Sequence, residues 1–241
     1  WVNTENLNLL IDALESCSCD VVLTDYQIVN MQDGSMMPVR AGESGIEYGK
    51  VYESFWGPAK TLPSIHGTTY KTSLLRKSGF AMQDGIFFVD EEYVILPYLE
   101  AKSLIYYPLD IYRYQVANPQ QSTSPKNRAK YYSHREKILK RLIQEYQKTH
   151  AADYSQDRLN YCFERIRRGI GDHFTTLLIY IENKKEGRKL AGKWKNYIQN
   201  EAPEFWPFVR RKVEILMLLN RLHISQGWYV KIKDTVYHNK K

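Results

Sequence analysis

The stretch Gly85-Ile-Phe-Phe-Val-Asp-Glu-Glu-Tyr93 is the part of the sequence around which the fold is predicted to form. Its apolar first half is typical of a buried strand, and three consecutive carboxylates follow, beginning with Asp90. Apolar residues at helical spacing then continue from Tyr93 to Leu99. The pattern predicts a strand that delivers Asp90 to a helix N-terminus, where free N–H groups and the helix dipole favour an ionised carboxylate.

Asp90 has two interpretations at this position. In α/β folds, ligands bind where strands end and helices begin, so Asp90 is a candidate functional residue. An acid at the start of a helix is also an ordinary N-cap, and the local sequence by itself favours that role.

The first half of the chain alternates between strand and helix patterns, which predicts an α/β fold. The clearest strand is Asp20-Val-Val-Leu-Thr-Asp-Tyr-Gln-Ile-Val29, whose apolar start suits a sheet buried on both faces. Further strands are expected at 36–39, 64–70, 103–107 and 111–116, and helices at 1–16, 48–55 and 72–78.

The second half reads as helix. The polar loop 118–125 contains two prolines and is the candidate boundary between a domain over residues 1–125 and a helical extension over residues 126–241. Amphipathic helices are expected within that extension at 126–149, 154–182, 188–199 and 204–222.

Composition separates the two halves further. Of the 241 residues, 43% are hydrophobic, which is enough for a core, and no apolar run approaches the length of a transmembrane helix. Residues 1–125 hold 8 Lys and Arg against 15 Asp and Glu, whereas residues 126–241 hold 26 against 12. The three cysteines fit neither a disulfide framework nor a zinc spacing. The sequence also lacks the glycine-rich nucleotide loops, the H-E-x-x-H metal motif and the G-x-S-x-G nucleophile motif.

Four segments in a fixed order carry a resemblance to a known family. They are Asp20-Val-Val-Leu-Thr-Asp-Tyr26 after a helix that begins near Trp1; Pro63-Ser-Ile-His-Gly67; Phe88-Val-Asp-Glu-Glu-Tyr93; and Tyr112-Arg-Tyr114 followed by Gln121-Ser-Thr-Ser124. Together they resemble the second half of a family-2, GT-A-type glycosyltransferase of bacterial surface polysaccharide synthesis. The fold class implied is a partial GT-A sheet with helices, followed by the α-helical extension.

The resemblance implies a role for Asp90 that the local sequence does not. In that family an acidic pair before a helix supplies the general base, which takes the proton of an acceptor hydroxyl in a single inverting step. Asp90 stands at the place of the base, and Val89 replaces the usual Glu before it. The resemblance therefore favours catalysis over the cap.

Cofactor and donor sites are implied to lie elsewhere. The family uses a divalent metal, Mg or Mn, held by an Asp-x-Asp motif before a Trp such as Trp1, and a nucleotide-sugar donor bound by its first half. Neither part is present in this sequence. The expectation is a hexosyltransferase stretch that binds no metal and does not turn over by itself.

The resemblance also implies residues that bind substrate. His66 and Gly67 stand at the acceptor-side wall, Glu91 is a candidate for binding acceptor hydroxyls, and Gln121 with Ser122 matches a loop that closes near the donor phosphates. The competing interpretations are a core histidine, an exposed acid at a helix start and a polar linker.

The basic helical extension has three interpretations. It can support the catalytic half, contact an anionic membrane through Arg210-Arg211-Lys212 and the apolar run that follows, or bind nucleic acid. No recognised nucleic-acid module is present, so nucleic acid is not an expected partner. The expected partners are a nucleotide sugar and a glycan or lipid-linked acceptor, at a cytoplasmic location or at the inner face of the plasma membrane. The alternative function is a non-catalytic helical adaptor or membrane-binding module.

Overall fold

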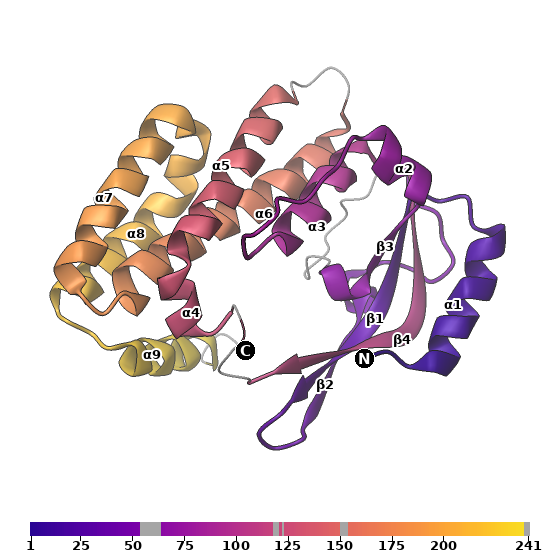
Figure 1. The fold of residues 1–241 in the computed structure, drawn as a ribbon, viewed down its shortest axis with the longest axis horizontal. Helices are drawn as coiled ribbons and strands as arrows, with labels where there is room; N and C mark the ends of the chain where they lie inside the picture. Colours follow the sequence, from indigo (N-terminus) through magenta and orange to yellow (C-terminus); the bar gives the residue numbers. More distant parts are fainter. Residues whose placement is uncertain (54–63, 118–120, 122, 150–153, 239–241) are drawn as a thin grey trace. The chain divides into compact units, whose positions relative to one another are not determined.

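The computed structural model describes residues 1–53, 64–117, 121, 123–149 and 154–238, and they form two compact units. Unit 1 comprises Trp1–Gln121 and Lys140–Arg165, and unit 2 comprises Ser122–Leu139 and Ile166–Lys241. Unit 1 is an α/β unit built on a mixed sheet, and the described part of unit 2 is helical (Figure 1). Helices α5 (Tyr132–Lys148) and α6 (Gln156–Thr175) contribute residues to both.

The elements that belong to unit 1 alone alternate between helix and strand. They are α1 (Thr4–Ser16), β1 (Val21–Asn30), β2 (Met36–Val39), the 3₁₀ turns η1 (Ala41–Ser44) and η2 (Ile65–Gly67), β3 (Thr68–Tyr70), α2 (Thr72–Lys77), α3 (Asp90–Glu100) and β4 (Leu104–Val116).

Strand β1 is the centre of the sheet. Strand β4 pairs with it in parallel along its whole length. Strand β2 pairs antiparallel with the second half of β1, and β3 pairs antiparallel with the first half. Because β4 takes one edge of β1, β2 and β3 share the other edge. The open, mixed sheet confirms the predicted α/β class.

Helices cover both faces of this sheet, because side chains alternate along a strand. Val22 of β1 and Ile105 of β4 pack with α1 in one core cluster. Their neighbours Val21 and Leu104 face the other way and line a small cavity with Tyr98 of α3. The sheet therefore lies between α1 and α3, as Figure 1 also shows.

Strand β4 corrects one prediction. Two strands, at 103–107 and 111–116, were expected, but a single strand runs from Leu104 to Val116. Thr24 pairs with Tyr107 and Asp25 pairs with Asp110, so Pro108 lies in a bulge. A bulge leaves a residue outside the ladder, and proline has no N–H to donate to it.

The segment before α3 corrects a second prediction. Residues 85–89 form no strand, because Gly85 (φ 71°) and Phe88 (φ 73°) adopt left-handed conformations that interrupt an extended chain. Phe88 is buried, while Phe87 is 42% exposed. Helix α3 nevertheless begins at Asp90, as predicted.

Other predictions had mixed outcomes. Helices α1 and α2 and strands β1 and β2 are confirmed, and Asn3 caps α1. The helix predicted at 48–55 is wrong over 48–53, where Tyr52 forms an isolated bridge with Leu104; residues 54–55 lie outside the described part. The segment 64–70 is strand only from Thr68 onward.

Unit 2 consists of helices. Besides its parts of α5 and α6, its elements are α4 (Pro125–Lys130), a π-helical turn (Thr176–Tyr180), α7 (Lys184–Glu201), the 3₁₀ turn η4 (Pro203–Phe205), α8 (Trp206–Arg221) and α9 (Gln226–His238). The core includes Phe174, Trp194 and Phe205. Buried Asn220 of α8 donates to the carbonyl of Leu178 and accepts from Arg188 of α7.

The helical prediction for the second half is confirmed, but the helix expected at 126–149 is divided at Tyr131 into α4 and α5. Helix α9 was not predicted. The first part of unit 1 ends at residue 121 and unit 2 begins at residue 122, near the expected boundary. Residues 140–165 belong to unit 1.

Candidate functional site

His66 lies on an aromatic platform in unit 1. Its imidazole stacks on the rings of Tyr112 and Tyr114, with centroid distances of 4.9 Å and 3.9 Å, and meets the edge of Tyr26 at 5.5 Å. Tyr112 and Tyr114 are two residues apart on β4 and therefore share a face of the sheet. All four side chains are half-buried, so each ring keeps part of its surface open.

Gly67 explains why His66 lies so close to the sheet. A Cβ atom on Gly67 would stand 2.4 Å from the carbonyl oxygen of Thr24 on β1. Only glycine allows this approach, which brings η2 directly onto β1. The Ser64 hydroxyl accepts a hydrogen bond from the backbone N–H of His66 at 3.2 Å and fixes the start of η2. Gly67 is itself buried and acts here by letting His66 reach the tyrosines.

Asp90 is the first residue of α3 and is exposed. The residue before the helix, Val89, makes no side-chain cap hydrogen bond. Phe88 holds the chain in a left-handed conformation just ahead of Asp90, and such a conformation costs about 1–3 kcal/mol in a residue with a bulky side chain. Strain of this kind persists only where packing enforces it, and the buried Phe88 ring supplies that packing.

Asp90 and His66 interact electrostatically. Burial lowers the pKa of His66 below its ordinary value, and the negative charge of Asp90 raises it in part. The balance leaves a neutral imidazole beside an exposed carboxylate at neutral pH. A neutral imidazole both donates and accepts hydrogen bonds, and a carboxylate at a helix N-terminus accepts protons or hydrogen bonds.

A buried ion pair secures the segment that carries Asp90. Glu92 is fully buried, and its carboxylate accepts hydrogen bonds from the backbone and side chain of Gln83 and from Arg141 of α5 at 2.8 Å. The same guanidinium donates to the carbonyl of Ala81. These bonds connect the loop before α3, at Ala81 and Gln83, to Glu92 in the first turn of the helix. They therefore fix where the helix begins.

The remaining predicted residues are placed as follows. Glu91 is half-buried next to Asp90, and its backbone N–H donates to the carbonyl of Phe88. The side-chain amide of Gln121 donates to the carbonyl of Gln115, just after β4. Ser122 lies outside the described residues. Of the predicted residues, His66 and Gly67 are adjacent in η2, and the charge of Asp90 acts on His66.

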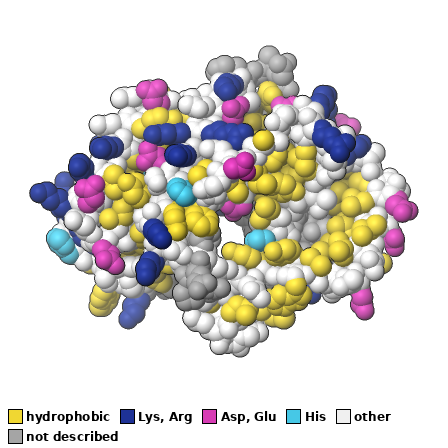
Figure 2. All heavy atoms as spheres, viewed as in Figure 1, with side chains coloured by type: hydrophobic (Ala, Val, Ile, Leu, Met, Phe, Trp, Pro, Cys, Tyr) yellow, Lys and Arg dark blue, Asp and Glu magenta, His cyan; other side chains and the backbone are white. Residues whose placement is uncertain are grey.

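Three tyrosines of the site were not identified as functional from the sequence. Tyr112 and Tyr114 were noted only as part of a resemblance, and Tyr26 only as the end of a strand segment. Their spacing carried a usable signal, since residues at i and i+2 in a strand face one way. Figure 2 shows hydrophobic side chains gathered over the sheet of unit 1.

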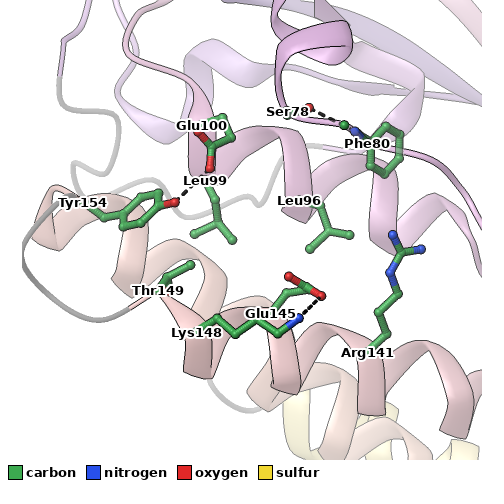
Figure 3. A pocket seen from close by; sticks show the side chains of 11 residues that line it. Ser78, Phe80, Leu96, Leu99, Glu100, Arg141, Glu145, Lys148, Thr149 and Tyr154 are labelled. Carbon is green, nitrogen blue, oxygen red and sulfur yellow. Dashed lines mark hydrogen bonds and ion pairs between the residues drawn. The ribbon is translucent and has the colours of Figure 1, made fainter.

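A pocket at the other end of α3 has a different chemistry. Its volume is about 320 Å³, and its lining comes from α3, α5 and the residues that follow α2 and α5 (Figure 3). Its charges are matched: Lys148 pairs with Glu145 at 2.8 Å, and Glu100 accepts a hydrogen bond from Tyr154 at 2.8 Å. This pocket shows no surplus of charge that would favour an ion.

Metal ligands do not gather in the described part of the chain. Among those residues, no group of three His, Cys, Asp or Glu side chains could hold a metal ion.

Comparison of the sequence with protein-family models and with curated proteins gave no match.

Proposed function

We propose that unit 1 forms the acceptor side of an inverting glycosyltransferase of the GT-A type, in which Asp90 is the general base. The observation that carries the proposal is the exposed carboxylate of Asp90 at the N-terminus of α3, within electrostatic reach of a histidine that lies on three tyrosines. The sequence resemblance in the four segments around β1, η2, α3 and β4 supports the same assignment.

The chemistry requires little beyond this arrangement. An acceptor hydroxyl gives its proton to the Asp90 carboxylate while its oxygen bonds to the anomeric carbon of the donor sugar. The bond between that carbon and the donor diphosphate breaks in the same step, and the diphosphate leaves with the electron pair. A positioned base contributes about 10²–10⁴-fold to such a rate. The proposed step uses no metal contributed by the described residues.

The platform would orient the acceptor. One face of a pyranose ring presents C–H groups, and half-buried aromatic rings offer it an apolar surface, while nearby polar atoms fix its orientation. Tyr112 and Tyr114 supply the surface, and His66 supplies hydrogen-bonding atoms close to Asp90. A glycan or lipid-linked sugar is the class of acceptor that this surface fits.

The test is sugar transfer by the whole protein as its source organism makes it. We expect Asp90→Asn to reduce kcat at least 10²-fold, because the amide cannot accept the proton. Asp84→Asn is the matched control, since Asp84 is an exposed acid in the loop before α3. Full activity in Asp90→Asn would remove Asp90 from the mechanism.

A second candidate function, contact with an anionic membrane, is favoured by the surface of unit 2. Apolar residues of α8 lie exposed at a helical spacing that forms one stripe, and α9 exposes more: Phe208, Ile215, Leu218, Leu222 and Trp228. Arg211 falls within that stripe. In the part of the chain that the structure describes, no helix is long and apolar enough to cross a membrane. We propose a peripheral contact at the cytoplasmic face.

Co-sedimentation with anionic vesicles tests this candidate. We expect binding at low salt that weakens as salt rises and is lost in a Leu218→Gln/Leu222→Gln variant. Equal binding to neutral and anionic vesicles would contradict it.

A further inference from the structure

A basic pocket lies within unit 2, away from the residues assigned above. It has a volume of about 710 Å³, within the range of small-molecule sites. Four helices line it. The cationic side chains in the lining are Arg128 of α4, Arg167 and Arg168 of α6, and Lys212 of α8, and the carboxylate in the lining is that of Asp172.

Two of these cations contact Asp172. The Lys212 ammonium pairs with the Asp172 carboxylate at 2.9 Å, and both side chains stay partly exposed. Arg128 donates to the backbone carbonyl of Asp172 at 3.2 Å and lies over the ring of Tyr180. These contacts bring cations from α4 and α8 to one residue of α6.

Gly171 makes room for the lysine. A Cβ atom at that position would lie 3.3 Å from the Cδ and Nζ atoms of Lys212. The Lys212 side chain therefore crosses α6 at its glycine and reaches Asp172 from α8. This close crossing places charged side chains of α6 and α8 in the same pocket.

The carboxylate does not neutralise the pocket. Burial raises the pKa of Asp172, but the charge and hydrogen bond of Lys212, together with the charges of Arg135 and Arg128, leave it below its ordinary value. Asp172 is thus ionised, and a single negative charge faces four positive ones in the lining. Unit 2 as a whole carries 21 Lys and Arg residues against 8 Asp and Glu, so its field adds to the local surplus.

The types of cationic side chain in the lining indicate the class of ligand. Three of the four lining cations are arginines, whose planar guanidinium groups match the paired oxygens of phosphate. The pocket also has an apolar side formed by Phe208 and Val209, and the ring of Tyr229. Its lining holds four cationic side chains and one carboxylate, whereas the lining of the unit 1 pocket in Figure 3 holds equal numbers of each sign.

We propose that the pocket formed by Arg128, Arg167, Arg168 and Lys212 binds a phosphate or diphosphate group, either free or as the headgroup of a lipid. The apolar side then receives whatever the phosphate is attached to. This proposal concerns unit 2 alone and stands independently of the role of Asp90.

Binding of inorganic pyrophosphate to the full chain is the first test, measured by calorimetry at two salt concentrations. The variant is Arg167→Gln/Arg168→Gln, because Arg168 is exposed and Arg167 half-buried and neither change opens a core. The control is Lys185→Gln/Lys193→Gln, which removes the same charge from exposed positions on α7 outside the pocket. We expect the Kd to rise at least tenfold in the variant and less than twofold in the control.

Vesicles distinguish the two sources of the phosphate. Vesicles of phosphatidylcholine with phosphatidic acid are compared with vesicles that carry phosphatidylserine at equal surface charge. Preferential binding to phosphatidic acid that pyrophosphate displaces supports a lipid headgroup, and pyrophosphate binding without that preference supports a free phosphate. If both probes bind the arginine variant and the wild type equally, or if the lysine control loses as much affinity as the variant, the proposal is overturned.

Discussion

The imidazole of His66 lies nearly parallel to the ring of Tyr114, with 3.9 Å between the centroids and 25° between the planes. The contact joins a 3₁₀ turn to the far half of β4 and holds the imidazole on the sheet. Stacking on a partly buried ring removes water from His66, which disfavours its charged form. The negative charge of Asp90, at the start of α3, acts in the opposite direction and raises the pKa of His66.

The first prediction concerns the pKa of His66. NMR titration of the imidazole should give a value below the ordinary 6.5, and Asp90→Asn should lower it further, because the substitution removes the charge that raises it. Asp84→Asn should leave the value unchanged. A pKa that rises or stays fixed in Asp90→Asn would mean that the two side chains do not interact.

The sign of the pH effect on stability follows from the same shift. The unfolded chain binds a proton at His66 more readily than the folded chain does, since the folded pKa is depressed. The stabilising contribution of neutral His66 is therefore complete above pH 6.5 and is lost as the pH falls through the folded pKa. Replacing His66 by Gln should flatten this part of the stability profile, as measured by urea denaturation.

The second prediction separates acceptor binding from proton transfer and rests on the proposed function. Tyr114→Ala removes the ring on which His66 stacks and should raise the KM for the acceptor about tenfold, with a smaller change in kcat. Asp90→Asn should instead lower kcat, with a smaller change in the KM for the acceptor. Tyr48→Ala is the control, because Tyr48 is an aromatic residue of unit 1 with a 69% exposed side chain. Equal effects of Tyr114→Ala and Tyr48→Ala on KM would contradict a platform.

Much of the fold could be predicted because individual helices and strands show their own apolar periodicity in the sequence. The run Val21-Val-Leu23 predicted the central strand, and helical spacing predicted α4 to α8. Special backbone conformations could not be predicted in the same way. Phe88 adopts a left-handed conformation that its own sequence does not signal, so an apolar run that looks like a strand is a loop. Strand β4 was predicted as two strands, because the bulge that accommodates Pro108 depends on pairing with β1 and leaves no local signal.

The candidate site was predictable only in part, for a related reason. Asp90 could be placed at a helix start from local pattern, but its neighbours come from β1, η2 and β4. The packing of Gly67 against Thr24 decides that His66 meets the tyrosines, and a contact between such distant segments leaves no periodic signal. The buried role of Glu92 was hidden because it stands in a run of three acids that looks solvated.

The third prediction concerns the ion pair between Glu92 and Arg141. Arg141→Ala leaves a fully buried carboxylate without its cation and should cost about 3 kcal/mol. Native-state hydrogen exchange of the α3 amides measures this cost within unit 1. Adding Glu92→Gln should recover part of the loss, since the buried charge is then gone.

Lys148→Ala provides the comparison for that pair. Lys148 bonds to Glu145 on the surface at the same distance of 2.8 Å, with 69% of its side chain exposed. Exposed pairs contribute less than about 1 kcal/mol, because water screens them. A similar cost for Arg141→Ala and Lys148→Ala would show that burial of Glu92 does not govern the stability of the loop before α3.

The fourth prediction compares two glycines. Gly67→Ala should destabilise unit 1 by about 1–3 kcal/mol, because the new Cβ would stand 2.4 Å from a backbone oxygen on β1 and η2 must move away. Gly192→Ala, in α7, should instead stabilise unit 2 by about 0.5–1 kcal/mol, since its Cβ meets nothing within 4 Å and alanine favours a helix. Hydrogen exchange resolves the two units.

Gly67→Ala also tests how the platform is assembled. If η2 must lie against β1 for His66 to stack on Tyr114, the movement forced by the methyl group should expose the imidazole to water. The pKa of His66 should then rise toward its ordinary value, because burial is the larger cause of its depression. An unchanged pKa in a destabilised Gly67→Ala protein would show that the stacking of His66 does not depend on the close contact between η2 and β1.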